Sequence, residues 1–367
     1  MESQLIYQIG LTKINGVGDI TARQLLLSLG DAEAVFTEKN RLLEKIPNIG
    51  TKTITAIKDP QVLVEAEKEL AFIEKNHIRT YFLADDNYPK RLRECADAPI
   101  LFYFKGQTDL NAQRIVSIVG TRSITDYGRS LTETLLKDLA ASFPDMLIVS
   151  GLAYGVDICA HRNALKQGLP TVGVLAHGLD RIYPPSHRGT AVEMLQQGGL
   201  LTEFTSGTMP DRPNFVMRNR IVAGLADATI VVESAEKGGS LITADIAFSY
   251  ARDVFTFPGR TTDVHSRGCN ALIQQNKAAL ITSAADLMRA LRWDATSTKP
   301  EALQTALSFP VEEDDPITAL IREKKEIHIN QLALLLDMSV QELTPYLFDL
   351  EMDGRIRTMP GGVYKVV

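Results

Sequence analysis

The sequence has little cysteine and lacks long apolar segments. Its three cysteines, Cys95, Cys159 and Cys269, are far apart and lack the close Cys or His spacing of a zinc site or a disulfide framework. No apolar run approaches the roughly 20 residues that span a bilayer. The opening residues MESQLIYQIG contain neither the basic region nor the long apolar region of a secretory signal. We therefore expect a cytoplasmic protein without a structural metal or a membrane contact.

Basic residues are also scarce. The chain contains 39 Lys and Arg against 45 Asp and Glu, a formal net charge of -6. Because phosphate binding needs clustered Lys and Arg, this balance excludes a protein that coats nucleic acid over its whole surface. Any nucleic-acid contact must be local. With 367 residues, of which 45% are apolar, the chain is long enough for two or three domains.

Residues 1–80 are predicted to form a small helical domain with two similar glycine turns, INGVG at Ile14–Gly18 and IPNIG at Ile46–Gly50. Each turn precedes a helical pattern, at Thr21–Leu29 and Thr51–Ile57 respectively. This is the helix-hairpin-helix (SAM-like) pattern, in which a turn offers backbone N–H groups to a phosphate. The second turn has Asn48 in place of the first glycine, a residue that tolerates left-handed dihedrals. A packing role is favoured over phosphate binding, since the segment has nearly balanced charge.

Residues 81–293 are predicted to form one domain with an N-terminal extension. From Asn111 to about Trp293 its sequence consists of short β-branched runs that alternate with helical periods. The predicted strands are Ile115–Val119, Met146–Ser150, Thr171–Leu175, Leu200–Thr202, Ala228–Val232, Val254–Thr256 and Ala279–Ile281. Predicted helices between them include Tyr127–Ala141, Val156–Gln167, Phe215–Leu225 and Leu241–Ala251. Apolar strands separated by helices predict an α/β domain with a Rossmann-like, doubly wound and mainly parallel sheet.

The last part of the chain predicts a linker at 294–315 and a winged helix at 316–367. The linker is rich in Thr, Ser, Pro and acidic residues, and the domain combines three helical periods with a hairpin whose loop is Pro360-Gly361-Gly362. Its predicted recognition helix, Val340–Met352, is acidic. Since carboxylates repel phosphates in the major groove, a protein-contact or accessory role is favoured for this domain. The acidic side chains of this helix and the turn after it are Glu342, Asp349, Glu351 and Asp353.

Ligands of an open parallel sheet bind at the carboxyl ends of its strands, and four loops stand out there. The first contains Gly120, Thr121 and Arg122. The glycine allows close backbone approach, and the arginine fork suits a phosphate. No GxGxxG motif is present, so a dinucleotide site is not predicted.

The second loop, Ser150–Asp157, contains small residues that permit close approach of a ligand. Asp157 and His161 fall at i and i+4 on one helix face. Both a general acid/base pair and a mutually satisfied structural pair fit this spacing. The structural pair is favoured, because neither a nucleophile nor a set of metal ligands accompanies it.

The third segment, Arg212–Arg220, gathers three arginines and Phe215 into nine residues. Arginines for phosphates and an aromatic face for an unpaired base are what a single-stranded nucleic acid requires, with stacking worth about 1–3 kcal/mol per base. Arg220 is expected to brace the fold instead. The fourth segment, Glu233–Thr243, combines a strand end, a Gly-Gly turn and a helix start that can bind an anion, with Ser240 as a candidate N-cap.

These loops, in this order, resemble the DNA-processing protein A (DprA/Smf) family. The similar stretches are SIVGTR at Ser117–Arg122, SGLAYGVDICAHRNAL at Ser150–Leu165, FVMRNRIVAGLADATIVVES at Phe215–Ser234, KGGSLITADIAFSYARDVFTFPG at Lys237–Gly259 and SRGCNALI at Ser266–Ile273. The resemblance implies binding of single-stranded DNA and loading of the RecA recombinase onto it, chiefly in natural transformation. It also implies a homodimer formed through the Rossmann-like domain.

Carried over by motif, the resemblance assigns residues to two surfaces. Those implied to bind DNA are Gly120, Thr121, Arg122, Ser150, Gly151, Arg212, Phe215, Arg218, Asn219, Lys237, Gly239 and Ser240. Those expected at the dimer surface are Ser266, Asn270, Leu272 and Ile273. No catalytic residue, metal or cofactor is expected.

Two other functions compete with this interpretation. The first is a nucleotide phosphoribohydrolase of the lysine-decarboxylase-like (LOG) group, which resembles PGGxGTxxE where this chain has KGGSLITADIA. A carboxylate is missing at the position of the catalytic Glu, although Asp245 lies nearby, so the enzyme is disfavoured. The second is a winged-helix transcription regulator with a ligand-sensing domain, which the acidic recognition helix disfavours.

Overall fold

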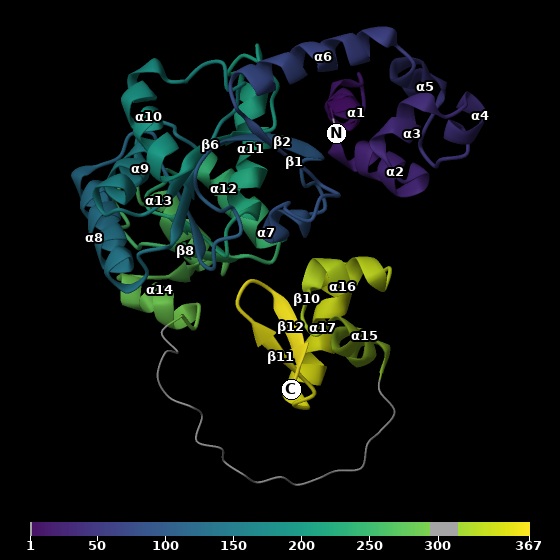
Figure 1. The fold of residues 1–367 in the computed structure, drawn as a ribbon. Helices are drawn as coiled ribbons and strands as arrows, with labels where there is room; N and C mark the ends of the chain where they lie inside the picture. Colours follow the sequence, from purple (N-terminus) through teal and green to yellow (C-terminus); the bar gives the residue numbers. More distant parts are fainter. Residues whose placement is uncertain (1, 294–314) are drawn as a thin grey trace.

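The computed structural model describes residues 2–293 and 315–367 (Figure 1). The predicted linker at 294–315 therefore lies outside the described residues, apart from Asp315. A helical N-terminal part, a central α/β domain and a C-terminal winged helix follow one another along the chain, and the winged helix lies against the central domain.

The N-terminal part consists of helices alone. They are α1 (Glu2–Lys13), α2 (Asp19–Leu29), α3 (Ala32–Thr37), α4 (Asn40–Leu43), α5 (Thr51–Ile57) and α6 (Pro60–Lys75). The two predicted glycine turns precede α2 and α5. Asn48 has φ 64° and Gly16 has φ 77°, so the asparagine adopts the left-handed conformation of the glycine that it replaces. Gly18 and Gly50 occupy the two N-cap positions, and neither helix has a side-chain cap.

The central domain is built on a nine-stranded sheet of order β1-β2-β6-β5-β4-β3-β7-β8-β9. From β6 to β9 all neighbours are parallel, which confirms the doubly wound prediction. The two antiparallel strands at one end of the sheet, β1 at its edge and β2 between β1 and β6, were not predicted. The strands are β1 (Arg79–Phe82), β2 (Leu101–Gly106), β3 (Ile115–Val119), β4 (Leu147–Ser150), β5 (Thr171–Val174), β6 (Gly199–Thr202), β7 (Ala228–Val231), β8 (Asp253–Thr256) and β9 (Ala279–Leu280).

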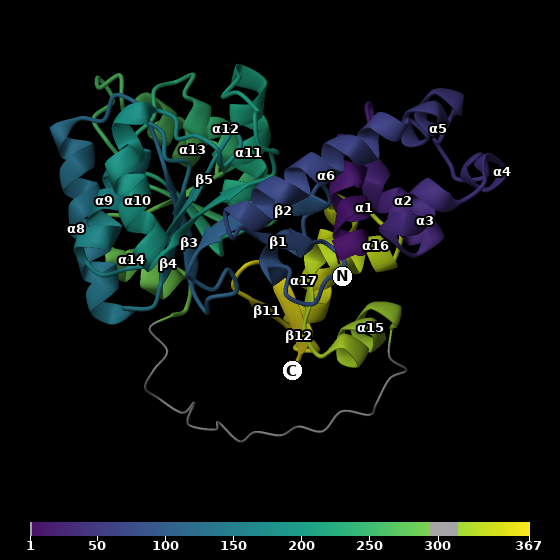
Figure 2. The same cartoon turned by 45° about the horizontal axis from the view of Figure 1, so that its top comes forward.

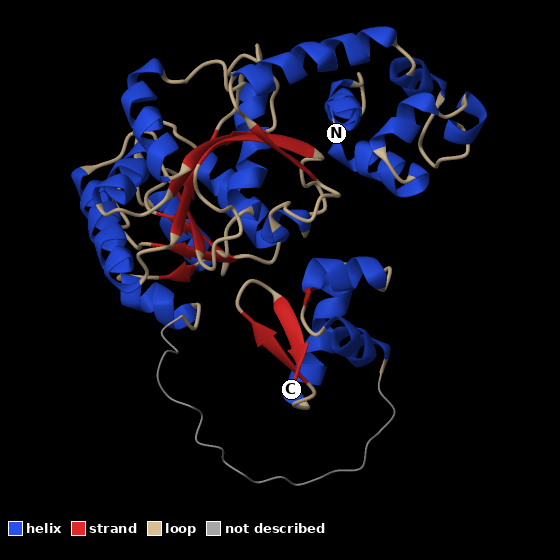
Figure 3. Cartoon of the chain, in the orientation of Figure 1, coloured by secondary structure: helices blue, strands red, loops and turns tan. Residues whose placement is uncertain are grey.

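Helices cover both faces of this sheet (Figures 2 and 3). One face packs α8 (Asp126–Ser142), α9 (Val156–Lys166) and α14 (Ala284–Ala290) through buried leucines and alanines. The opposite face packs α11 (Arg212–Gly224), α12 (Gly239–Ser249) and α13 (Arg267–Gln274). The helix α10 (Arg188–Gln197) packs beside β5 and β6. Both faces are therefore buried, which explains why the parallel strands are continuous apolar runs.

The winged helix has the predicted elements and one additional short strand. Its elements are α15 (Pro316–Lys324), β10 (Ile327–His328), α16 (Ile329–Leu335), α17 (Val340–Met352), β11 (Ile356–Met359) and β12 (Val363–Val366). A capping box begins α17, because the Ser339 hydroxyl accepts from the backbone N–H of Glu342 while the Glu342 carboxylate accepts from Ser339 N–H. The three strands pair in the order β10-β12-β11.

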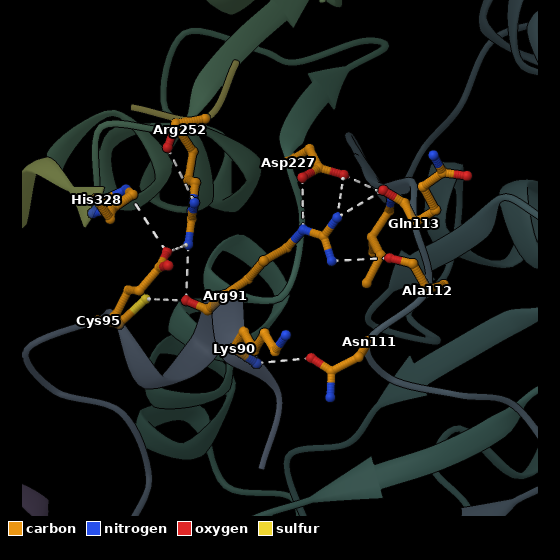
Figure 4. Close-up of polar contacts among 12 residues, drawn as sticks. Lys90, Arg91, Cys95, Asn111, Ala112, Gln113, Asp227, Arg252 and His328 are labelled. Atoms are coloured by element: carbon orange, nitrogen blue, oxygen red, sulfur yellow. Dashed lines mark hydrogen bonds and ion pairs between the residues drawn. The ribbon is translucent and has the colours of Figure 1, made fainter. Parts of the chain in front are cut away.

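The wing, which is the loop Pro360–Gly362, packs against the central domain (Figure 4). Arg252, whose side chain is only 2% exposed, donates to the Gly361 carbonyl oxygen (3.2 Å) and to the Glu94 carboxylate (2.9 Å). A Cβ on Gly362 would lie 3.0 Å from the Ala251 carbonyl oxygen. The fit is therefore close, and Arg252 joins both domains.

The helix α7 (Lys90–Arg93) carries the other half of this contact (Figure 4). The Arg91 carbonyl oxygen accepts from Arg252 at 2.8 Å, and the Arg91 guanidinium binds both oxygens of the Asp227 carboxylate, at 2.6 and 3.0 Å. Since Asp227 directly precedes β7, this ion pair fixes α7, which contacts Arg252 below the wing, to the sheet.

Candidate functional site

A cavity of about 880 Å³ opens at the carboxyl ends of β3, β4 and β7. All four predicted segments contribute to its lining, the third of them as the first turns of α11. Ten of the twelve predicted DNA-binding residues lie on its wall: Gly120, Thr121, Arg122, Arg212, Phe215, Arg218, Asn219, Lys237, Gly239 and Ser240. Residues that are scattered over more than a hundred positions of sequence thus meet in one place, as the position of ligand sites in open parallel sheets predicts. This cavity is named the first cavity.

Arg122 and Phe215 form its most exposed corner. The Arg122 guanidinium lies over the Phe215 ring, with Cζ 5.5 Å from the ring centroid. Tyr183, from the loop after β5, lies on another side of the same ring at 6.0 Å between centroids. The arrangement places a positive charge beside a half-buried aromatic face, a combination that suits a phosphate and the base attached to it.

Arg218 supplies a second, deeper positive charge. It is 4% exposed, and no described residue accepts a hydrogen bond from its Nε. Burial lowers the pKa of Arg218, and the attraction of Asp157 opposes that effect. A Cβ at position 151 would lie 1.5 Å from Arg218 Nη1, so only glycine fits there. Gly151 therefore supports the site from behind, although it does not line the cavity.

The N-terminus of α12 forms the remaining wall. Gly238 is its N-cap, and no side chain caps the first backbone N–H groups. Lys237 and Gly239 beside it are exposed. Since uncapped N–H groups and the helix dipole attract anions, this end of the cavity favours a phosphate oxygen. The prediction of Ser240 as the N-cap is wrong, because its hydroxyl donates to Ser234 Oγ (3.0 Å) from within the helix.

The second predicted loop contributes less to the surface than expected. Ser150 is fully buried, and its hydroxyl donates to the Ile118 carbonyl oxygen at 2.6 Å. Ala153 and Asp157 line the cavity from this loop. The Asp157 carboxylate accepts from the backbone N–H groups of Gly151 and Ala153, at 3.2 and 3.3 Å, so it holds the loop in shape. Burial raises the pKa of Asp157, while Arg218 acts in the opposite direction.

Asp157 and His161 do not bond to each other. The favoured prediction, a structural pair in which each residue satisfies the other, is therefore wrong about the partner of each residue. His161 is fully buried and its Nδ1 lies 2.7 Å from Thr171 Oγ1. Burial lowers the pKa of His161 to about 3. It does not line the cavity, which also removes it as a general base there. Both residues are structural, each with its own partner.

Arg220 braces the fold, as expected. Its guanidinium binds the carboxylates of Asp19 (2.8 Å) and Glu203, and it donates to the Asp97 carbonyl oxygen. Asp19 begins α2, so this arginine ties the helical N-terminal part to the central domain. It points away from the first cavity, whose lining residues do not include it.

Sequence reasoning missed Tyr183, and the predicted dimer residues remain a prediction. An aromatic followed by two prolines in a loop after a predicted strand was an available signal for Tyr183. Three of the four residues expected at the dimer surface are engaged within the chain. Ser266 is buried and donates to Asp263, Asn270 bonds both backbone groups of Gly259, and Leu272 is in the core. Ile273 is the one that remains partly exposed.

Neither a metal site nor a membrane span is found in the described parts of the chain. Residues 2–293 and 315–367 contain no group of three or more His, Cys, Asp or Glu side chains that could hold a metal ion. None of the helices in these ranges is long and apolar enough to cross a membrane.

The fold and the cavity define a Rossmann-like protein with an arginine- and aromatic-lined site at the carboxyl edge of its sheet and an attached winged helix. Residues 79–292 match the family of DNA recombination-mediator protein A, and residues 297–362 match the DprA winged helix domain. The chain belongs to the DNA-processing protein A (DprA/Smf) family.

Its relatives support this over most of their length. The DNA processing protein DprA of Streptococcus pneumoniae is 35% identical over 286 residues, which cover 77% of this chain and 96% of that protein. Protein Smf of a Synechocystis strain is 33% identical and covers 79% of this chain and 73% of its own length.

Solved structures agree with the fold. The X-ray structure of the S. pneumoniae protein aligns with a TM-score of 0.63 at 32% identity, covering 77% of this chain and 97% of that one. The structure of DNA processing protein A from Helicobacter pylori, described with its single-stranded DNA binding mode, aligns with a TM-score of 0.53 at 33% identity. It covers 59% of this chain and 96% of that one.

Proposed function

We propose that the chain binds single-stranded DNA in the first cavity and mediates recombination by loading a RecA recombinase onto that strand, chiefly during natural transformation in the cytoplasm. The observation that carries the DNA-binding part is the convergence of Arg122, Phe215 and the uncapped N-terminus of α12 on one cavity in an acidic protein. Family membership supports the recombination part, since the matching family is that of a recombination mediator.

The chemistry of the wall fits an unpaired strand. Arg122, Arg212 and Lys237 are exposed cations that can follow a phosphodiester backbone. Phe215 offers a face on which any base can stack, so the site needs no particular sequence. The N–H groups of α12 add a fixed anion contact.

The rival phosphoribohydrolase finds no support in the same cavity. Asp245, the carboxylate nearest to the missing catalytic Glu, lines the cavity but is bonded to Lys277 Nζ at 2.7 Å. The carboxylate that lies nearest to the missing Glu is thus already paired within the chain. We therefore propose a binding protein rather than an enzyme.

We further propose a homodimer formed through the outer side of α12 and the edge strand β9. Phe248 is 52% exposed, and Leu280 also presents a large apolar surface. The Lys277–Asp245 ion pair joins α12 to the turn before β9, so these side chains belong to one side of the domain. Ile273, the partly exposed residue of the original prediction, lies at the end of α13 before the same turn.

The winged helix is assigned an accessory, protein-contacting role. Its wing is held by Arg252 and packed against Ala251, so it is engaged with the central domain. The outward side of α17 combines the acidic residues noted above with exposed Tyr346, Phe348 and Met352. Such a surface repels a duplex and suits a partner protein with basic and apolar groups.

The proposed function is tested by a salt-titrated binding assay with the full chain, in which a fluorescent oligothymidylate is compared with a duplex of the same length. We expect tighter binding to the single strand at every salt concentration, and a logarithmic affinity that falls linearly with the logarithm of salt concentration. Equal or tighter binding to the duplex would contradict the proposal. Release of a free base from a nucleoside monophosphate would instead favour the enzyme.

A further inference from the structure

A second cavity, of about 630 Å³, lies beside the first at the end of β8 and the start of α8. Its lining residues are Tyr127, Pro258, Gly259, Arg260, Asp263 and Ser266. Tyr127, on the first turn of α8, is 47% exposed, and its hydroxyl donates to the Pro258 carbonyl oxygen at 3.0 Å. The ring is therefore held in one place while a large part of it faces solvent.

The segment Glu233–Ala235 after β7, here named the wall, hydrogen-bonds to elements of both cavities. The backbone N–H of Thr121, which lines the first cavity, donates to the Glu233 carbonyl oxygen at 2.7 Å. The buried Glu233 carboxylate accepts from both the backbone N–H (2.9 Å) and the hydroxyl of Thr125. Thr125 is the N-cap of α8, two residues before Tyr127. One residue thus links the edge of the first cavity to the helix that presents the tyrosine.

The same wall is bonded to the second cavity through Ser234. Its hydroxyl accepts from Ser240, on the first cavity, while its backbone N–H donates to the His265 carbonyl oxygen at 2.8 Å. His265 directly precedes Ser266, which lines the second cavity. Two independent sets of hydrogen bonds therefore cross the wall, and the two openings are neighbours at one edge of the sheet.

The second cavity, like the first, combines an exposed arginine with an aromatic ring, although it also contains one carboxylate. Arg260 is exposed and forms no ion pair with any described residue. The acidic member, Asp263, accepts hydrogen bonds from the His265 backbone N–H (3.0 Å) and from the Ser266 hydroxyl (3.1 Å), so its negative charge is partly satisfied within the loop. An exposed aromatic ring beside an unpaired arginine is what stacks a base and holds its phosphate without regard to sequence.

We propose that the second cavity is a further nucleotide subsite, which takes the strand after it leaves the first cavity, with one base on the Tyr127 ring and one phosphate on Arg260. This inference rests on the proposed binding of single-stranded DNA and extends it along the sheet edge. It assigns the strand a direction of travel, from the end of β3 past the end of β7 to the end of β8.

The test is the dependence of affinity on oligonucleotide length. Fluorescence anisotropy compares the full chain with Tyr127→Ala on oligothymidylates of about 4 to about 16 nucleotides, the usual range of single-strand site sizes. We expect unchanged affinity for the shortest strands and a loss of about 5- to 150-fold for the longest, the value of one stacked base. Tyr127→Phe, which keeps the ring, should retain the affinity. Arg260→Ala should lower the affinity for long strands alone and reduce the slope of the salt dependence by about 0.7.

Tyr346→Ala, an exposed helical tyrosine on the winged helix, is the matched control and should change nothing. Unaltered binding of the shortest strand by Tyr127→Ala also shows that this variant is folded. The subsite is refuted if Tyr127→Ala binds long strands as tightly as the parent, or if short and long strands lose affinity equally. Failure of the parent chain to bind any single strand would overturn the proposed function itself, and the subsite with it.

Discussion

The Arg122 guanidinium lies over the ring of Phe215, although the two residues come from a loop after β3 and from the first turns of α11. Neither residue has another strong partner: Arg122 forms no ion pair with a described residue, and Phe215 meets Tyr183 only obliquely, at 57° between ring planes. A cation on an aromatic face at an exposed site contributes only about 0.5–1 kcal/mol. A contact this weak is easily exchanged for a phosphate and a base, so the pair is positioned for a ligand rather than for stability.

Arg122→Ala tests the phosphate half of this pair. We expect affinity for single-stranded DNA to fall about 10- to 150-fold, the value of a hydrogen bond to a charged group. The slope of the logarithmic affinity against logarithmic salt concentration should also decrease by about 0.7, because one phosphate contact disappears. Both are measured by anisotropy across a salt series. Arg289→Ala, an exposed arginine on the last turn of α14, is the control, and an effect of equal size there would contradict the assignment.

Phe215→Ala tests the stacking half. The expected loss is about 1–3 kcal/mol of binding free energy, with the salt slope unchanged because no phosphate contact is removed. Phe215→Tyr, which retains the aromatic face, should bind as the parent does. An altered salt slope in Phe215→Ala, or an affinity equal to that of the parent, would show that the ring does not carry a base.

Arg252→Ala tests whether Arg252 holds the wing against the central domain. The substitution removes hydrogen bonds to Glu94, to the Arg91 carbonyl oxygen and to the wing, each worth about 1.5–3 kcal/mol because the donor is charged. We expect the winged helix to leave the central domain, so that the radius of gyration in small-angle scattering increases while affinity for single-stranded DNA persists. Gly362→Val, which places a side chain against the Ala251 carbonyl oxygen, should have the same effect from the other side. Unchanged scattering in both variants would mean that other contacts hold the domain.

The parts of the fold that have a local sequence pattern were predicted, and the parts that depend on distant partners were not. The parallel strands were predicted because each is a short apolar run, most of them rich in β-branched residues. Asn48 was recognised because its tolerance of positive φ belongs to the residue itself. The antiparallel strands β1 and β2 were missed. The strand β2 joins the sheet through β6, which lies about a hundred residues further along the chain, and no local signal indicates that pairing.

The part of the candidate site that follows from sheet topology was predicted. Gly120–Arg122 and Arg212–Asn219 meet because carboxyl ends of parallel strands share an edge. The partners of Asp157 and His161 could not be predicted in the same way: i, i+4 spacing says which helix face they share, whereas Thr171 comes from β5 and the Gly151 N–H from a loop. The short helix α13 likewise did not reveal which of its residues face inward.

The buried state of His161 predicts a loss of stability on acidification. Burial lowers the pKa of His161 to about 3, whereas in the unfolded chain it is near 6.5. Between these values the unfolded chain binds a proton that the folded chain does not, so the free energy of unfolding falls as the pH falls. From pH 7 to pH 5 this one group should remove about 2 kcal/mol. Urea unfolding is followed by the fluorescence of the sole tryptophan, Trp293, which packs on Phe143 in the same domain.

His161→Gln isolates that contribution. The Thr171 hydroxyl donates to the Ile148 carbonyl oxygen (3.0 Å), so its oxygen accepts from His161 Nδ1–H and leaves Nε2 unprotonated and without a partner among the described residues. Glutamine can keep the bond to Thr171 but cannot take up a proton. The variant should therefore lose about 2 kcal/mol less than the parent between pH 7 and pH 5, whatever its stability at pH 7. An identical pH dependence in His161→Gln and the parent would mean that His161 takes up its proton within the folded domain.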